Sequence, residues 1–213
     1  MIMIAIVNVD KNWGIGCDNK LLYSFKTDRD FFKYMTIGNI VVYGKNTLLS
    51  LPKQKPLIGR INIVITSDPK SIPTISKESC HYYAHIQRSN IQNQLLFAEI
   101  RSNPDFNNEH EHSTTLISAN DLTLIKDIAS FMGKHSDDIY VCGGESIYSQ
   151  LLPECDLAYV TMHNHQNKDV TPDKFFPNIE NDPNWEVNRK EGEGVLSDKT
   201  RYTITSYRKK EFV

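Results

Sequence analysis

Short apolar runs alternate with amphipathic segments over most of the chain. The apolar runs are rich in β-branched residues and occupy positions 2–9, 40–43, 61–66, 139–142 and 157–162. Uninterrupted runs of this length are typical of strands that are buried on both faces of a sheet, as parallel strands are. Segments with helical spacing occupy positions 28–35, 46–50, 121–131 and 145–152, with a poorly defined one at 90–101. The alternation predicts a layered α/β fold built on a largely parallel sheet.

Two parts of the chain depart from this alternation. Strand-like runs at 185–190 and 200–209 are separated by a Glu-Gly-Glu-Gly sequence and a Ser-Asp pair, which predicts a terminal antiparallel hairpin. Positions 69–114 are polar, contain three prolines and lack a sustained period, so they are interpreted as an insertion between two sheet strands. A length of 213 residues suits a single domain, 1–213, that carries this insertion.

Composition narrows the possible partners and the compartment. A net charge of -2 gives no electrostatic reason to expect nucleic acid or an acidic membrane as a partner. The apolar start of the chain is too short to span a bilayer and lacks the features of a secretory signal. The four cysteines form no Cys-x-x-Cys pair, which argues against a zinc site and favours a reducing compartment, so a cytoplasmic location is expected.

One acidic residue stands among large apolar side chains in the first helical segment. Asp28, Phe31, Phe32 and Met35 follow helical spacing, and Thr27 is placed to cap a helix that begins near residue 27. The helix dipole favours an ionised Asp28, whereas the aromatic neighbours exclude water and favour the neutral acid. Opposed influences of this kind are typical of functional groups, although a first-turn aspartate also serves simply to match the dipole.

Two loops have the pattern of phosphate-binding turns. In each, a strand is followed by glycine and then by the start of a helix, at positions 41–47 and 141–148. Free backbone N–H groups at such a turn bind anions, although the same glycines also occur in ordinary tight turns. Neither loop matches the Gly-x-Gly-x-x-Gly or the Gly-x-x-x-x-Gly-Lys-Ser/Thr pattern, so a standard Rossmann domain and a P-loop nucleotidase both lack their fingerprint.

Taken together, these motifs resemble the dihydrofolate reductase family. The resemblance covers about the first sixty residues and the stretch from 137 to the C-terminus. It rests on Gly14-Ile-Gly-x-Asp-Asn-Lys-Leu, Asp28, Gly44-Lys-Asn-Thr47, Leu57-x-Gly-Arg60, Gly143-Gly144, Thr161 and Phe175-Phe-Pro177. It implies a three-layer α/β/α sandwich around an eight-stranded, mostly parallel mixed sheet with an antiparallel C-terminal strand. It also implies NADPH-dependent reduction of 7,8-dihydrofolate to 5,6,7,8-tetrahydrofolate, which supports one-carbon metabolism and thymidylate and purine synthesis.

The resemblance assigns roles around the substrate. Asp28 matches the family acid that accepts hydrogen bonds from the pterin and favours protonation of its N5, and Thr161 matches the threonine that binds this acid. Arg60 matches the arginine that binds the α-carboxylate of the glutamate tail through two parallel hydrogen bonds. In isolation, Arg60 would be interpreted as a solvated loop residue. The resemblance also places Ile4, Ala5, Phe32 and Leu57 in the substrate pocket.

The cofactor expected from the resemblance is NADPH. The matching positions are Ile6, Ile15, Gly16, Gly44, Lys45, Asn46, Thr47, Thr66, Ser67, Cys142, Gly143, Gly144, Glu145, Ser146 and Tyr148. The first glycine loop would bind the pyrophosphate, and Thr66 with Ser67 would receive the adenosine 2′-phosphate. Ile15 and Gly16 match the mobile loop that covers the nicotinamide and excludes water.

Several positions depart from the family pattern. Leu22-Tyr23 replaces a common Pro-Trp pair and Lys26 replaces a second proline, which predicts a looser covering loop. Arg29 stands where an apolar residue usually faces the substrate. Glu145 replaces the third glycine of the second cofactor loop and Ser146 a commonly basic residue, which would weaken electrostatic binding of phosphate.

Other interpretations stay open. A Glu-His-Glu-His sequence at 109–112 could bind a metal, but it is interpreted as a solvated loop and no metal is expected. A pyrimidine reductase of riboflavin synthesis shares the cofactor loops, and a noncatalytic binding protein could keep the fold. Asp28, Thr161 and Arg60 favour the folate reductase. The expected partners are dihydrofolate and antifolate inhibitors, with no nucleic acid, no membrane and a monomeric state.

Overall fold

A computed structural model describes residues 3–88, 95–103, 113–134, 139–164 and 170–210 of the chain. The chain forms two compact units. The terminal unit comprises Ile2–Tyr34 and Val141–Val213, and the central unit comprises Met35–Tyr140. The assignment of the whole chain to a single domain stays a prediction.

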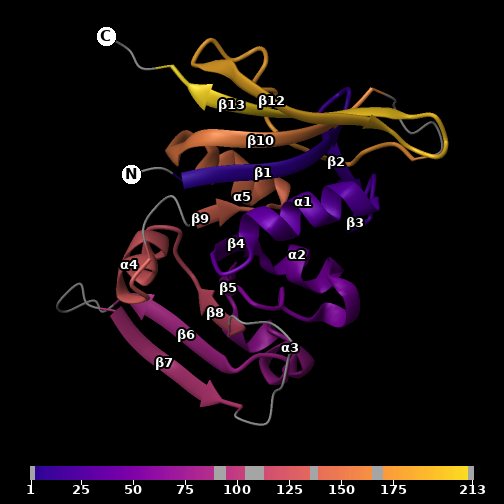
Figure 1. Cartoon of the computed structure of the whole chain (residues 1–213). Helices are drawn as coiled ribbons and strands as arrows, with labels where there is room; N and C mark the ends of the chain where they lie inside the picture. The colour runs from indigo at the N-terminus through magenta and orange to yellow at the C-terminus, as the bar shows by residue number, and fades with distance from the viewer. Residues whose placement is uncertain (1–2, 89–94, 104–112, 135–138, 165–169, 211–213) are drawn as a thin grey trace. The chain divides into compact units, whose positions relative to one another are not determined.

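The terminal unit is built on a mixed sheet of long strands (Figure 1). Strand β1 (Met3–Asp10) pairs in parallel with β10 (Cys155–His163), and β13 (Arg201–Lys209) pairs antiparallel with β10. Strand β12 (Trp185–Val195) completes the antiparallel hairpin that the sequence predicts. The apolar runs therefore form the expected strands, with bounds that differ by one or two residues.

The Glu-Gly-Glu-Gly sequence lies inside β12, so its prediction as the link between two strands was wrong. The strand passes through it because the pairing with β13 shifts register at Val187/Arg189 and at Lys190/Gly192. A Cβ atom on Gly194 would lie 2.5 Å from the hydroxyl oxygen of Tyr202. Glycine is therefore needed where the two strands approach each other.

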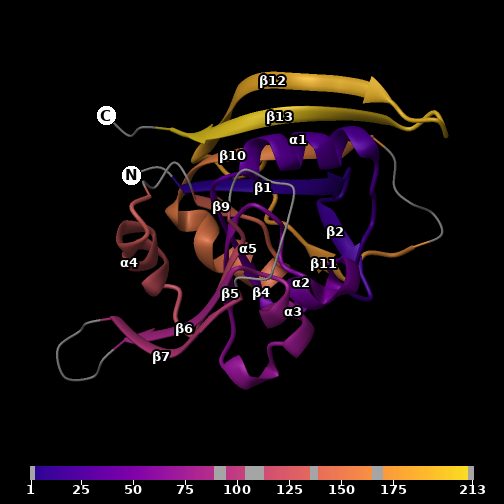
Figure 2. The ribbon, with the colours of Figure 1, turned by 60° about the horizontal axis from the view of Figure 1, so that its bottom comes forward.

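The segment that follows β1 forms a small second sheet. Strand β2 (Gly14–Cys17) pairs antiparallel with both β3 (Lys20–Leu21) and β11 (Lys174–Phe175), as Figure 2 shows for β2 and β11. From the sequence, this glycine-containing stretch was expected to form a loop. The strands are short, and the pairing depends on glycine because a Cβ atom on Gly16 would lie 2.7 Å from the carbonyl oxygen of Lys20. Apolar periodicity therefore gave no sign of these strands.

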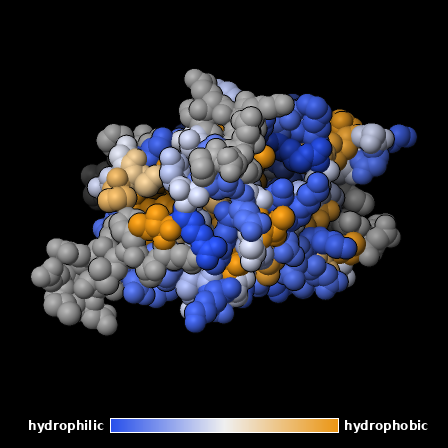
Figure 3. Space-filling view, turned by 90° about the horizontal axis from the view of Figure 1, so that it is seen from below, coloured by the Kyte–Doolittle hydropathy of each residue, from blue (hydrophilic) through white to orange (hydrophobic). Residues whose placement is uncertain are grey.

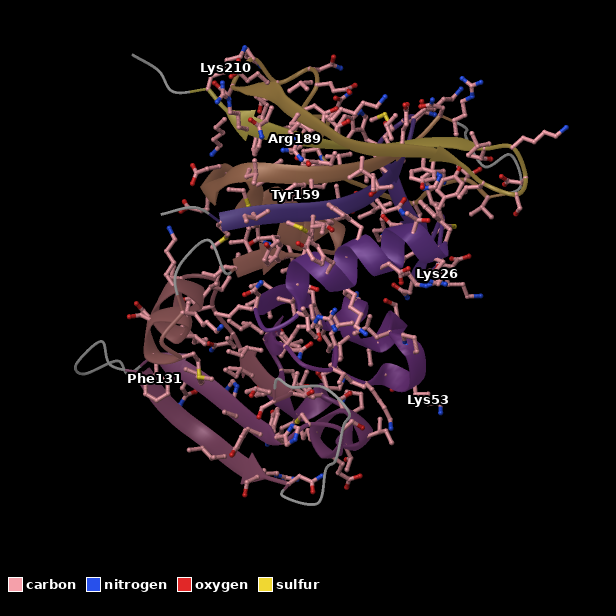
Figure 4. All side chains as sticks on the ribbon, in the orientation of Figure 1. Lys26, Lys53, Phe131, Tyr159, Arg189 and Lys210 are labelled. Carbon is pink, nitrogen blue, oxygen red and sulfur yellow. The ribbon has the colours of Figure 1, made fainter. Side chains whose placement is uncertain are left out.

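Helix α1 (Lys26–Thr36) begins one residue before the predicted start. Thr27 lies inside the helix, so its predicted role as a cap was wrong. Phe31 packs edge to face against Tyr159 of β10, with ring centroids 5.7 Å apart; Tyr159 is labelled in Figure 4. Helix α5 (Glu145–Leu151) follows the second glycine loop and continues into a short 3-10 helix (Leu152–Glu154).

The central unit is built on a second set of parallel strands. Strands β4 (Ile40–Gly44), β5 (Ile61–Ile65), β8 (Thr115–Ala119) and β6 (Tyr82–Arg88) pair in parallel in that order, and β7 (Leu95–Ser102) is antiparallel to β6. Its helices are α2 (Lys45–Ser50), α3 (Thr74–Glu78) and α4 (Leu124–Phe131), with 3-10 turns at Pro52–Gln54 and Pro69–Ser71. Strand β9 (Ile139–Val141) follows the undescribed residues 135–138.

The predicted helix at 90–101 was wrong, because residues 95–102 form the strand β7. The interpretation of 69–114 as a plain insertion also missed α3, β6 and β7, and the strands β6 and β7 form an antiparallel pair. In β6 the buried Tyr83 follows the exposed Tyr82, the alternation of a strand with one buried face. The Glu-His-Glu-His sequence lies outside the described residues.

Among the described residues, the surface shows no feature that argues against the α/β fold class. Exposed apolar side chains are separated by hydrophilic ones on the face shown in Figure 3. All four cysteines are free thiols. Among the described residues, no helix is both long and apolar enough to cross a membrane. The mixed, mostly parallel strand arrangement with antiparallel C-terminal strands confirms the predicted α/β class.

Candidate active site

The carboxylate of Asp28 is the centre of a polar cluster in the terminal unit. Asp28 lies half-buried in the first turn of α1. The side-chain amide of Asn8 donates to Asp28 Oδ2 over 2.8 Å, and the hydroxyl of Thr161 donates to the same carboxylate. Asn8 and Thr161 are register partners on β1 and β10. Strands β1 and β10 therefore present paired donors to the acid.

Burial raises the pKa of the Asp28 carboxyl above its ordinary value. The hydrogen bonds from Asn8 and Thr161 and the positive charge of Arg29 act in the opposite direction but do not cancel the effect of burial. A ligand that offers further N–H donors to this carboxylate would stabilise its anionic form. The site is therefore poised to bind a planar group that carries hydrogen-bond donors.

The other α1 residues take different positions. Phe32 lies one helical turn after Asp28 and is half-buried. Arg29 is exposed, and its Nη1 donates to the hydroxyl of Ser24 over 2.9 Å. The guanidinium of Arg29 thus binds the segment that precedes the helix.

Strand β1 and helix α5 are joined by a buried tyrosine. Ile4, Ala5 and Ile6 are buried on β1, and the carbonyl oxygen of Ile6 accepts a 2.8 Å hydrogen bond from the hydroxyl of Tyr148. Burial raises the pKa of the Tyr148 hydroxyl well above its ordinary value. Tyr148 was predicted to contact the cofactor, and in this structure its hydroxyl anchors α5 to the strand.

The second glycine loop depends on its glycines. Gly143 has φ +105, and a Cβ atom there would lie 2.8 Å from the Tyr148 ring. The Gly143–Gly144 peptide bond is cis, and Gly144 precedes α5 without a side-chain cap. A larger residue at Gly143 would displace the loop. Because Gly143 has no side chain, a ligand can approach the loop backbone closely.

Glu145 makes a contact that the sequence did not predict. Its Oε1 accepts a 3.0 Å hydrogen bond from the backbone N–H of Phe175 in β11, instead of capping α5. Strand β11 in turn pairs with β2, which holds Ile15 and Gly16. Glu145 therefore ties the second glycine loop to the strand that was predicted to cover the cofactor.

The remaining predicted residues of this loop vary in exposure. Ile15 and Gly16 are buried, Cys142 is half-buried and Ser146 is exposed. The hydroxyl of Ser146 accepts a hydrogen bond from Gln150 one turn later. The terminal unit thus contains the predicted acid, its threonine partner and the second glycine loop.

The first glycine loop lies in the central unit between β4 and α2. Lys45 and Thr47 are half-buried, Asn46 is exposed and Gly44 caps the helix without a side-chain hydrogen bond. At the end of β5, the hydroxyl of Thr66 donates to the carbonyl oxygen of Asp68, whereas Ser67 is exposed. Of the two residues predicted to bind the 2′-phosphate, Ser67 is the one that faces solvent.

Arg60 is buried, with an exposed fraction of 6%, which argues against the alternative of a solvated loop residue. Its Nε donates to Thr36 Oγ1 over 3.0 Å, and its Nη1 donates to the carbonyl oxygen of Ile58 over 2.7 Å. These bonds fix the plane of the guanidinium. A fixed guanidinium plane is suited to bidentate binding of a carboxylate.

The loop that carries Arg60 is held by Asn62. The Asn62 side chain accepts from the backbone N–H of Leu57 over 2.9 Å and donates to the carbonyl oxygens of Leu57 and Arg60 over 3.0 and 3.1 Å. It also accepts a 2.7 Å hydrogen bond from the hydroxyl of Tyr43. One buried amide therefore sets the backbone of the predicted tail-binding loop.

Sequence reasoning missed Asn8 and Asn62. Both are amides within apolar runs that become β1 and β5. A polar residue in a buried strand requires hydrogen-bond partners, so each was a signal of a local polar network. The sequence could not indicate which groups would serve as partners.

One group of possible metal ligands occurs among the described residues. Cys17, Asp18 and Asp173 place their ligand atoms within 4.8 Å of one another, and the two carboxylates are exposed. Partial burial and the two acids raise the pKa of the Cys17 thiol. Exposed acidic groups often lie close together without an ion, so this geometry alone identifies no metal site.

Comparisons with known proteins identify the family of this chain. The family model described as dihydrofolate reductase matches residues 2–97 and 103–209. A dihydrofolate reductase of Bacillus subtilis is 27% identical over 197 residues, covering 92% of this chain and 87% of the relative. One of Schistosoma mansoni is 26% identical over 183 residues, covering 83% and 78%.

A solved structure shows the same fold. The dihydrofolate reductase from Enterococcus faecalis, determined with NADP(H) and RAB-propyl, superposes with a TM-score of 0.63 at 22% identity. The match covers 99% of this chain and 97% of that one. The fold and the match over nearly the whole chain define an NADPH-dependent oxidoreductase. The chain belongs to the dihydrofolate reductase family.

Proposed function

We propose that this chain reduces 7,8-dihydrofolate to 5,6,7,8-tetrahydrofolate with NADPH as hydride donor. The observation that carries the proposal is the lone, half-buried carboxylate of Asp28, held by donors from Asn8 and Thr161 in a member of this family. Hydride transfer to a C=N bond is easier when the nitrogen is protonated. A buried negative charge beside the ring favours that cation.

Asp28 orients the substrate in this proposal. Its carboxylate accepts hydrogen bonds from the amino group and ring N–H of the pterin, while Thr161 and Asn8 fix the direction of the two oxygens. The buried backbone of Ile4, Ala5 and Ile6 lines the pocket and excludes water. Phe32 packs on the rings, and Leu57 on the benzoyl portion of the substrate.

Arg60 binds the glutamate tail in this proposal. Its burial and its hydrogen bonds to Thr36 and Ile58 keep the guanidinium in one orientation before the substrate arrives. Preorganisation of this kind lowers the entropy that binding costs.

The residues of the cofactor loops fit a reduced dinucleotide, which supplies the hydride when bound. The positive φ of Gly143 and the absence of a side chain there allow close approach. We assign Lys45, Asn46 and Thr47 to the pyrophosphate region, Ser67 with Thr66 to the 2′-phosphate, and Ile15 and Gly16 to the nicotinamide cover. The second loop contributes Cys142, Gly144, Glu145 and Ser146, with Tyr148 as its anchor.

The cellular setting follows from the same features. We place the protein in the cytoplasm because its four cysteines are free thiols. We also propose that it acts as a monomer built as one domain and binds antifolate inhibitors. The net charge of -2 supports the absence of nucleic acid among its partners.

A spectrophotometric assay of NADPH oxidation tests the proposal. Purified protein is mixed with NADPH and dihydrofolate, and the product is identified as tetrahydrofolate by mass spectrometry. Parallel reactions contain NADH or a ribosylamino-pyrimidine in place of the proposed partners. Turnover with dihydrofolate and NADPH supports the assignment. Turnover with the pyrimidine alone, or NADPH binding without any turnover, would refute it.

A further inference from the structure

His163, the last residue of β10, is a buried residue that has no role in the site described above. Its side chain is fully buried, and neither ring nitrogen has a hydrogen-bond partner among the described residues. Burying a polar ring without a partner is unfavourable. The contacts of this ring must therefore compensate for the missing hydrogen bonds.

Those contacts are aromatic. Tyr23 stacks on the imidazole with centroids 3.8 Å apart and an interplanar angle of 12°, and Phe25 meets it edge-on at 5.1 Å. Tyr202 of β13 lies 6.5 Å away and packs on Phe25 at 4.7 Å. Tyr23 and Phe25 belong to the segment 22–25, which connects β3 to α1. His163 is thus the platform on which this connecting segment rests.

Strand β10 also contacts the start of α1, which follows this segment. Thr161 and His163 are two residues apart on β10, so their side chains lie on one face of the sheet. Thr161 hydrogen-bonds Asp28, and His163 packs against Tyr23 and Phe25. The start of α1 is therefore fixed at two points of one strand.

We propose that His163 is a positioning residue for Asp28, and that protonation of its ring releases Tyr23 and Phe25 and loosens the start of α1. The inference rests on the proposed function of Asp28. The neutral imidazole stacks on Tyr23 and tolerates an apolar setting. A charged imidazolium without a hydrogen-bond partner does not, because its desolvation is far more costly.

The groups around His163 set the direction of its pH response. Asp10 faces it in register on β1, Tyr23 and Tyr202 flank it, and Asp198 approaches from the turn between β12 and β13. Asp10 is buried, and its Oδ2 lacks a hydrogen-bond partner among the described atoms. Burial lowers the pKa of His163 to about 4, and the attraction of Asp198 only partly opposes this effect.

While the imidazole of His163 packs on Tyr23 and Phe25, it stays unprotonated down to about pH 4, whereas a ring released from this packing regains its ordinary pKa of 6.5. A fall in pH between these values therefore favours release of the ring.

Three variants test the proposal. His163→Phe keeps the aromatic platform but cannot be protonated, and His163→Ala removes the platform. Tyr202→Phe is the matched control, because it keeps both its own ring and the imidazole. Each protein is assayed for kcat and for KM of dihydrofolate between pH 8 and pH 5.5. Carbon-13 NMR follows the histidine rings and the Asp28 carboxyl from pH 8 to pH 4, a range that includes the His163 pKa of about 4.

We expect His163→Ala to raise KM at pH 7 about tenfold and to shift the Asp28 carboxyl signal, while His163→Phe stays within about twofold of the wild type. On acidification, KM should rise at least threefold more in the wild type and in Tyr202→Phe than in His163→Phe. In NMR, the Asp28 signal of the wild type should move as His163 titrates.

The opposite results would overturn the inference. These are an unchanged KM and Asp28 signal in His163→Ala, or an acid profile of His163→Phe that equals that of the wild type. If His163→Ala does not fold, the wild type decides. A His163 signal that titrates near pH 6.5 while the Asp28 signal stays constant would also overturn the inference. If the wild type fails to turn over dihydrofolate, the proposed function fails, while the two NMR signals still decide whether His163 positions Asp28.

Discussion

The amide nitrogen of Asn8 lies 2.8 Å from Oδ2 of Asp28, and it joins the first strand to the first helix across twenty positions of the sequence. Thr161 reaches the same carboxylate from the strand that pairs with β1. The acid is therefore held from two adjacent strands. Its orientation is fixed before a ligand binds, which is the property that an orienting carboxylate needs.

Substitution of Asn8 tests this relationship. Asn8→Ala removes a hydrogen bond that favours the anion, so the pKa of Asp28 should rise further above its ordinary value. Carbon-13 NMR of the Asp28 carboxyl measures the shift. The acid limb of dihydrofolate turnover should move to higher pH in parallel. A titration identical to that of the wild type would show that Asn8 does not act on the carboxyl.

Arg60→Lys tests the binding of the tail. Lysine keeps the charge but cannot form two parallel hydrogen bonds, so KM for dihydrofolate should rise about tenfold to a hundredfold with little change in kcat. A reduced pterin that lacks glutamate should show no such change. Arg208→Lys, at an exposed residue that binds Glu186, serves as the control. Equal effects on the two substrates would remove Arg60 from the tail site.

Glu145→Gln tests the electrostatics of the second cofactor loop. Glutamine keeps an acceptor for the Phe175 N–H but removes the negative charge from the first turn of α5. Affinity for NADPH should increase about twofold to fivefold at low salt, and the gain should fade at high salt. Fluorescence titration measures the dissociation constant, with Glu186→Gln as the control. A loss of affinity would mean that the carboxylate itself assists binding.

The stability of the protein should depend on pH through His163. Its folded-state pKa of about 4 lies below the ordinary 6.5, so the unfolded state binds a proton that the folded state refuses between these values. The free energy of unfolding should therefore be largest above pH 6.5 and should decrease as pH falls toward 4. Urea denaturation at pH 7.5 and pH 5.5 measures the decrease, which should be smaller in His163→Phe. An equal decrease in both proteins would assign the effect to other groups.

The sequence predicted the elements that carry a strong apolar signal. The strands β1, β4, β5 and β10 come from runs rich in apolar, mostly β-branched residues, and the burial of these residues in the structure explains why the sequence pattern predicted strands there. Strand β2 and strand β11 have little such signal, because they are short and their pairing depends on glycines and on a partner far along the chain. Strand β7 was interpreted as a helix because no period was clear in its segment.

Residues of the candidate site were predictable from the sequence where the site requires an unusual residue type. The acid at position 28, close to the aromatic pair Phe31 and Phe32, and the Gly143-Gly144 pair are unusual enough to identify from the sequence. The donors to Asp28 were only partly predictable, because Asn8 owes its role to the register between β1 and β10. The platform formed by His163 depends on four rings from three separated segments, and no local pattern indicates such an arrangement.

The pH dependence of turnover by Asp28→Asn tests the central claim most directly. Asp30→Asn is the matched control, because Asp30 lies two residues away in α1 and forms an exposed ion pair with Lys26. We expect Asp28→Asn to fold and to bind NADPH as the wild type does, with turnover of dihydrofolate about a hundredfold lower at pH 7. Its turnover should recover partly in acid, where solvent protonates the substrate. Turnover at pH 7 equal to that of Asp30→Asn would contradict the account.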